Sequence, residues 1–164
     1  MNILLVRHAK ATEKGGMADP YRPLTSRGRR DALTVGKMLR AADLHLDAIV
    51  TSPLVRAVET ASLVAVGLDW EEGLEVEPEL SPSHPAEAVL EEVLQPRIEL
   101  GGLAIVGHEP QLGLLLRLLL KGYAPSLRKA AAVLVRWEGP ESAGKFEWVI
   151  HPDLEKPSKN LEDV

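Results

Sequence analysis

The chain of 164 residues is 45% hydrophobic and 26% charged, values that fit a single globular domain and exclude disorder along the whole chain. Its formal net charge of -5 argues against a nucleic-acid-binding protein, whose surface is usually basic. The sequence contains no cysteine, which excludes disulfide bonds, thiolate nucleophiles and cysteine-bound metals.

Neither a membrane helix nor a secretion signal is expected. No apolar run reaches the roughly 18 residues that a membrane-spanning helix needs. The N-terminal sequence has no basic region and no cleavage site of a signal peptide. We therefore expect a cytoplasmic protein. Asparagine and glutamine are scarce whereas arginine, glutamate and leucine are abundant, a composition typical of thermophilic proteins.

Short apolar runs alternate with helical patterns along the chain. The runs 3–6 and 103–106 are continuous and short, which is typical of strands buried on both faces. In chain order, the predicted elements are a strand at 3–6, a helix at 26–42, a strand at 48–50, a helix from 53 to about 67, a short strand around 76, a helix at 86–94, a strand at 103–106, a helix at 110–120, and two strands at 131–137 and 146–150 joined by a turn at 139–140.

Residues with known helix-end preferences mark the helix boundaries. Thr25 and Ser52 are of the residue types that accept a hydrogen bond at a helix N-terminus. Pro53 would occupy the first helical position, where its missing N–H has no cost. Gly67 is expected to end the same helix.

The alternation of strands and helices predicts an α/β fold. Its sheet should be mainly parallel and covered by helices on both faces, with the last two strands as an antiparallel hairpin. We expect one domain over residues 1–150. The remainder, 151–164, is polar and contains two prolines, and it is predicted to be a loosely held C-terminal extension.

Chemically suited side chains follow several of the predicted strands. Arg7 and His8 follow the first, His108 follows the fourth, and Arg56 lies in the first turn of the helix after the second. Ligands bind beyond the carboxyl ends of strands in such sheets, so we expect these four residues to meet at one edge. Two guanidinium groups suit a tetrahedral dianion, and two histidines offer a nucleophile and a polar partner. The set predicts a phosphoryl site without a metal.

Each feature taken alone has a structural explanation. An Arg-His pair after a strand is more often a surface or capping pair, and a lone arginine on a helix is usually solvated. Gly15 and Gly16 are not followed by the Lys-Ser/Thr of a phosphate-binding loop, and a flexible loop is the better interpretation. The functional hypothesis therefore rests on several phosphate-suited residues coinciding at the strand ends of one sheet.

Four segments resemble the histidine phosphatase superfamily, which includes the phosphoglycerate mutases. The segment 5–11 resembles its Arg-His signature, 52–61 resembles Ser-Pro-x-x-Arg-Ala-x-x-Thr, and 106–108 resembles its third motif. Arg22-Pro23-Leu24-Thr25, followed by Gly28, resembles a fourth. The branch of greatest similarity is that of the short SixA-type phosphohistidine phosphatases.

This resemblance implies a three-layer α/β/α sandwich of the phosphoglycerate mutase type. It also implies that His8 is the nucleophile and carries a phosphohistidine intermediate, with no cofactor and no metal. Arg7, Arg56 and protonated His108 would hold the equatorial phosphoryl oxygens. Ala9 stands where many members have glycine.

The general acid is less clearly marked than the other groups. Asp19, in the loop before Arg22, resembles an acidic loop residue of the SixA branch and is the first candidate. Glu79 and Glu109, which follow strands, are rivals, and each of the three could instead be a solvated carboxylate.

The substrate class follows from the length of one interval. Only 51 residues separate Arg56 from His108, which leaves little chain for the lid that larger members insert there. An open site favours phosphohistidine on a protein partner. The alternatives are a phosphatase for a small phosphoester or diphosphate, and a phosphopeptide-binding module without turnover. A mutase is least favoured, because it must retain a sugar phosphate under a lid.

Overall fold

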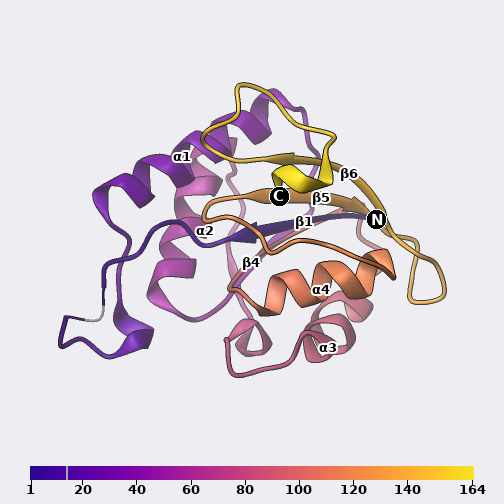
Figure 1. The fold of residues 1–164 in the computed structure, drawn as a ribbon, viewed down its shortest axis with the longest axis horizontal. Helices are drawn as coiled ribbons and strands as arrows, with labels where there is room; N and C mark the ends of the chain where they lie inside the picture. The colour runs from indigo at the N-terminus through magenta and orange to yellow at the C-terminus, as the bar shows by residue number, and fades with distance from the viewer. Residues whose placement is uncertain (14) are drawn as a thin grey trace.

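The computed structural model describes residues 1–13 and 15–164, and a six-stranded sheet forms its centre (Figure 1). The strand order across the sheet is β3-β2-β4-β1-β5-β6. In chain order the strands are β1 Asn2–Arg7, β2 Ala48–Thr51, β3 Glu75–Val76, β4 Gly102–Gly107, β5 Ala132–Arg136 and β6 Lys145–Ile150.

The first four strands are parallel, and their registers bring their carboxyl ends to one edge. Val6 of β1 and Thr51 of β2 both pair with Val106 of β4. Strand β5 is antiparallel to β1, and β6 is antiparallel to β5. The predicted parallel sheet with an antiparallel edge hairpin is therefore confirmed.

Helices cover both faces of the sheet, which gives three layers (Figure 1). Because side chains alternate along a strand, Leu4 and Val6 face one core while Ile3 and Leu5 face the other. The first core contains helices α1 (Ser26–Ala41) and α2 (Val55–Leu68). The second contains α3 (Ala86–Ala88), the π-helical turn Val89–Leu94 and α4 (Gln111–Leu120). Among the described residues, no helix is long and apolar enough to cross a membrane.

Helices α1 and α2 pack through two glycines. A Cβ atom on Gly67 would lie 2.7 Å from the Cα atom of Gly36, which is closer than side chains pack. The two backbones therefore touch directly, and this close approach brings the beginning of α2 near the segment that precedes α1.

Two predicted helices differ from the structure. Helix α2 begins at Val55 with Leu54 as its N-cap, so Ser52 and Pro53 precede it, and the side chain of Ser52 faces another partner described below. The predicted helix at 86–94 is α-helical only over α3 and continues as the π-helical turn, followed by the 3-10 turn Gln95–Arg97. Pro96 lacks the N–H that a further helical turn requires.

The C-terminal extension is held more firmly than its polarity predicted. Ser158 and Val149 form an isolated antiparallel bridge, and their backbone N–H groups donate to each other's carbonyl oxygens at 2.9 and 2.8 Å. Val164, at the end of the chain, is buried in the same core as α4. The expectation of a loosely held tail was wrong, because a few apolar and backbone contacts outweigh its polar composition.

Candidate active site

The carboxyl ends of β1, β2 and β4 bring two histidines together. The N–H of His8 donates to the carbonyl oxygen of Gly107 at 3.0 Å, so His8 extends the pairing of β1 with β4 by one residue. His108 follows β4 directly, and its ring centroid lies 5.1 Å from that of His8, with the planes tilted by 54°. The two histidine rings therefore lie side by side, as the sequence led us to expect.

The imidazole of His8 is fixed in one tautomer. Its Nδ1–H donates to the carbonyl oxygen of Ala9 at 2.7 Å, which leaves Nε2 with its lone pair. Burial lowers the pKa of His8 to about 4, and the positive charges of Arg56 and Arg7 act in the same direction against the Ala9 hydrogen bond. His8 therefore presents a neutral nitrogen nucleophile at neutral pH.

His108 is also neutral in the free site. Burial lowers its pKa to about 3, with further contributions from His8 and Arg56. Its Nε2 lies 2.7 Å from Oγ of Ser52, the residue that the sequence predicted as the N-cap of the following helix. The protonated His108 that the resemblance implies therefore requires an additional negative charge, which a bound phosphoryl group would supply.

Two arginines flank the histidines and are anchored by backbone carbonyls. Nη1 of Arg7 donates to the carbonyl oxygen of Leu127 at 2.7 Å, and Nη1 of Arg56 donates to that of Asp19 at 2.9 Å. The Nε atoms of both arginines and Nδ1 of His108 are buried without a hydrogen-bond partner among residues 1–13 and 15–164. Because buried polar atoms are normally paired, these three nitrogens suit the oxygens of a bound anion.

Asp19 lies at the site, but as an ion-pair partner. Its Oδ1 accepts hydrogen bonds from Nε and Nη2 of Arg22 at 2.9 and 2.7 Å, and its Oδ2 lies 3.1 Å from Nη2 of Arg56. The hydrogen bonds from Arg22 are the largest cause that holds the pKa of Asp19 below its ordinary value, with Arg56 adding to it. A carboxylate in this setting is a poor proton donor and a good support for two guanidinium groups.

The two rival carboxylates lie in different environments. Glu109 is half-buried, its Oε1 accepts a hydrogen bond from the N–H of Leu127 at 3.0 Å, and burial raises its pKa. Glu79 belongs to the 3-10 turn Pro78–Leu80 that follows β3. Burial thus favours the protonated form of Glu109, whereas the hydrogen bonds from Arg22 favour the ionised form of Asp19.

Thr60 is a supporting residue to which the sequence assigned no role. Its Oγ1 accepts a hydrogen bond from the N–H of Ala9 at 3.1 Å and donates to the carbonyl oxygen of Arg56 at 2.7 Å. Thr60 thus joins the segment after the nucleophile to the helix that carries Arg56. Its position as the last residue of the Ser-Pro-x-x-Arg-Ala-x-x-Thr motif was the available signal.

Gly28, in the fourth motif, allows α1 to pack against the segment after His8. A Cβ atom on Gly28 would lie 2.2 Å from the carbonyl oxygen of Lys10. That same oxygen accepts hydrogen bonds from the N–H of Thr25 at 2.9 Å and from its Oγ1 at 3.1 Å. Thr25 also accepts from the N–H of Gly28 at 3.0 Å, which confirms its predicted role as N-cap.

The interval between Arg56 and His108 builds the scaffold. Over these residues, all of them described, the chain forms the rest of α2, β3, short helical turns and β4, with short connections. Gln111 holds the turn after β3, because its Nε2 donates to the carbonyl oxygens of Glu79, Ser81 and His84 at 2.8, 3.2 and 2.8 Å. This segment forms no separate covering element over the site. Within the described ranges, no group of three or more His, Asp or Glu side chains could hold a metal ion.

Comparisons with known proteins agree with this geometry. The Histidine phosphatase superfamily (branch 1) matches residues 3–82. The phosphohistidine phosphatase SixA of Escherichia coli is 25% identical over 163 residues, which cover 98% of this chain and 100% of that protein. An uncharacterized protein of Picosynechococcus is 33% identical over 129 residues, 69% of each chain. The structure of the protein histidine phosphatase SixA complexed with tungstate superposes with a TM-score of 0.85 and covers 93% of this chain and 97% of that one.

The fold and the arrangement of the strand ends define an enzyme of phosphoryl transfer. The chain belongs to the histidine phosphatase superfamily.

Proposed function

We propose that this enzyme is a metal-independent phosphohistidine phosphatase, which removes the phosphoryl group from a phosphohistidine on a protein through an intermediate on His8. The observation that carries the proposal is the hydrogen bond from Nδ1–H of His8 to the carbonyl oxygen of Ala9, which leaves Nε2 of a neutral ring free to attack. The similarity to SixA, which extends over nearly the whole of both chains, supports the same substrate class.

In the first step, Nε2 of His8 attacks phosphorus. A new Nε2–P bond forms as the P–N bond to the substrate imidazole breaks, and the departing nitrogen takes a proton. We expect Arg7 and Arg56 to bind the equatorial oxygens, because the Nε atom of each is buried without a hydrogen-bond partner among the described residues. Because phosphoryl transfer depends mainly on positioning and charge stabilisation, this arrangement needs little further chemistry.

In the second step, water attacks the phosphorus of phospho-His8. The Nε2–P bond breaks, inorganic phosphate leaves, and His8 returns to the neutral form that its surroundings favour. A bound phosphoryl dianion favours the protonated form of His108, because its negative charge offsets the effect of burial on the pKa of His108. It would then donate a hydrogen bond to a phosphoryl oxygen.

Among the described residues, neither Asp19 nor Glu109 is a carboxyl group free to act as a strong acid, which favours a phosphohistidine over a phosphoester as the substrate. The pKa of Asp19 is lowered by its arginine partners, and Glu109 is already engaged with the N–H of Leu127. An alkoxide leaving group depends strongly on protonation by the enzyme, whereas an imidazole nitrogen is easier to expel. Glu109, whose pKa burial raises, is the carboxyl group best suited to supply the remaining proton.

Steady-state kinetics on a panel of substrates test the proposal. A phosphohistidine-bearing protein, p-nitrophenyl phosphate, a sugar phosphate and pyrophosphate are compared in the presence of a chelator. The phosphohistidine protein should show the highest kcat/KM, and the chelator should leave it unchanged. A small phosphoester whose kcat/KM exceeds that of the protein substrate by about tenfold or more, a difference of about 1.4 kcal/mol in transition-state stabilisation, would overturn the assignment.

The cytoplasmic location of the enzyme stays a prediction.

A further inference from the structure

A cavity of about 200 Å³ opens on the surface between the segment that follows β1, helix α1 and the segment that follows β6. We name it the lysine groove. Its lining consists of Lys10, Arg27, Asp31, Lys129, Pro152 and Asp153.

The lysine groove is tied to the nucleophile by the backbone. Lys10 is the second residue after His8, and the neighbour of Lys129, Ala130, donates its N–H to the carbonyl oxygen of His8 at 3.4 Å. The positive charge of Lys129 is also among the causes that lower the pKa of His8, after burial and the charges of Arg56 and Arg7. The backbone of the nucleophile thus lies between the two segments that supply Lys10 and Lys129 to the groove.

The charges of the groove favour an acidic occupant. Lys10 and Lys129 are both exposed, and neither forms an ion pair among the described residues. Of the two acidic residues, Asp31 lies 3.6 Å from Nε of Arg27 and balances it. Asp153 is exposed and is the one carboxylate of the lining without an arginine or lysine partner among the ion pairs of the described chain. The groove thus carries a positive excess in a protein whose net charge is -5.

Helix α1 adds to the positive potential. Its first turn contains no acidic residue and includes Arg27, so the helix itself does not oppose the positive end of its dipole, and the acidic group packed there, Glu59 of α2, pairs with Arg29. The segment after His8 packs directly on this turn through the carbonyl oxygen of Lys10 and the N–H of Thr25. The N-terminus of α1 and the two lysines therefore contribute positive potential to the same groove.

We propose that the lysine groove docks an acidic segment of the protein substrate, next to its phosphohistidine in sequence. Carboxylates of this segment bind Lys10 and Lys129 while the phosphoryl group enters the site. This inference rests on the proposed function and specifies how its protein substrate is recognised. Charge complementarity of this kind acts mainly on substrate encounter and KM.

The test uses two phosphohistidine peptides that differ only beside the phosphorylated residue, where one carries glutamates and the other glutamines. The wild-type enzyme should turn over the glutamate peptide with a kcat/KM about tenfold higher at low salt, mainly through KM, and high salt should remove the difference. The double variant Lys10→Glu/Lys129→Glu should lose or invert the preference.

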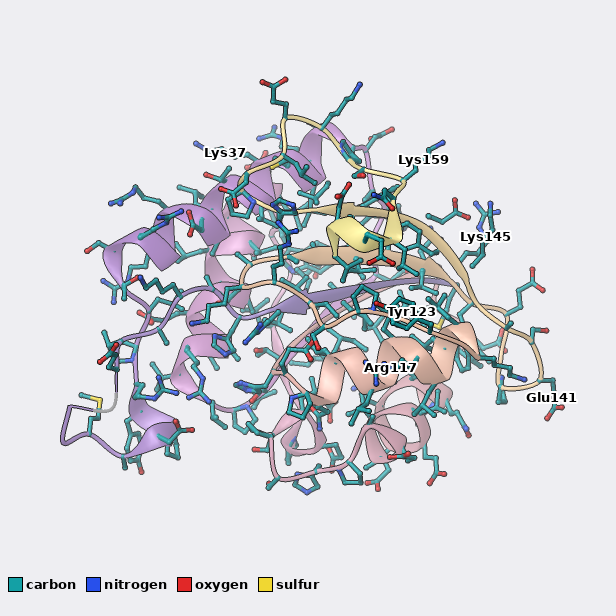
Figure 2. All side chains as sticks on the ribbon, in the orientation of Figure 1. Lys37, Arg117, Tyr123, Glu141, Lys145 and Lys159 are labelled. Carbon is teal, nitrogen blue, oxygen red and sulfur yellow. The ribbon has the colours of Figure 1, made fainter. Side chains whose placement is uncertain are left out.

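A matched control changes two other lysines by the same total charge. Lys37 lies about 15 Å along α1 from Arg27. Lys145 pairs with Arg136, which pairs with Asn2 at the beginning of β1, so it lies at the opposite end of the sheet from His8 (Figure 2). The double variant Lys37→Glu/Lys145→Glu should keep the preference for the glutamate peptide.

The possible failures are distinguishable. If the wild type hydrolyses both peptides equally at low salt, or if Lys10→Glu/Lys129→Glu keeps the preference, the docking surface is refuted while the phosphatase activity stands. If neither peptide is hydrolysed in a reaction that depends on His8, the proposed function itself fails, and the docking surface fails with it.

Discussion

The carboxylate of Asp19 lies 3.1 Å from Nη2 of Arg56 and also accepts two hydrogen bonds from Arg22. One acidic side chain thus holds two guanidinium groups at the edge of the site, although Asp19 lies in the 3-10 turn Asp19–Tyr21, 37 residues before Arg56 in the sequence. We propose from this relationship that Asp19 is a positioning residue rather than the proton donor that the sequence predicted.

Replacement of Asp19 should affect positioning rather than an ionisation. We expect Asp19→Ala to lower kcat/KM by about tenfold to a hundredfold, since a misplaced guanidinium weakens transition-state binding. Asp19→Asn should recover part of this loss, because its amide oxygen still accepts from Arg22. The pH profile of kcat should keep its shape in both variants. Loss of one limb of the profile in Asp19→Asn would instead identify Asp19 as the acid.

The histidines should titrate well below their ordinary range. Burial together with Arg56 and Arg7 lowers the pKa of His8 to about 4, and burial with His8 and Arg56 lowers that of His108 to about 3. In NMR titrations of labelled imidazoles, both rings should therefore be neutral at pH 6. Arg56→Ala removes a positive charge, so the pKa of His8 should rise. Protonation of both rings near pH 6.5 in the wild type would contradict this electrostatic description.

Ser52 should support catalysis through His108. The change Ser52→Ala removes the hydroxyl that lies 2.7 Å from Nε2 of His108, and an unpaired buried group costs about 1–3 kcal/mol. We expect kcat/KM to fall by about tenfold or more. The matched variant Ser62→Ala removes a hydroxyl that donates to a carbonyl on the exposed side of α2 and should keep wild-type kinetics. Equal kinetics for both variants would remove Ser52 from the site.

Gln111 should stabilise the turn after β3. The side chain is buried, and its Nε2 donates to three backbone carbonyl oxygens, so the carboxylate in Gln111→Glu would face those oxygens without a donor. We expect the free energy of unfolding in denaturant to fall by about 3 kcal/mol or more. Gln95→Glu makes the same change at an exposed position and should leave stability within about 0.5 kcal/mol of wild type. Equal stability of the two variants would contradict the structural role of Gln111.

The sequence predicted the elements whose local pattern agrees with their burial. The continuous apolar run of β1 is buried on both faces, and Thr25 caps α1 as its residue type indicated. The same patterns placed Arg7, His8, Arg56 and His108 at strand or helix ends, and parallel topology then brings such residues to one edge. These parts depend on local periodicity and on a general property of α/β sheets.

The parts that sequence could not supply depend on contacts between distant residues. Ser52 has the chemistry of a helix cap, but its hydroxyl lies against His108, 56 residues further along the chain. Asp19 has the chemistry of an acid, yet two arginines fix it as a carboxylate. The C-terminal tail is polar, but the burial of Val164 attaches it to the core. In each case contacts that the residue type does not specify decide between two roles that it allows.

The intermediate on His8 is the central claim, and rapid-quench mass spectrometry tests it most directly. The enzyme is mixed with a phosphohistidine-bearing protein, quenched within a turnover under alkaline conditions that preserve phosphohistidine, and digested for mapping. We predict an acid-labile phosphoryl group on His8, and we predict that His8→Asn forms none and loses turnover by about a thousandfold or more while its thermal unfolding remains cooperative. A phosphoryl group on His108 or another residue, or turnover by His8→Asn close to that of the wild type, would contradict the account.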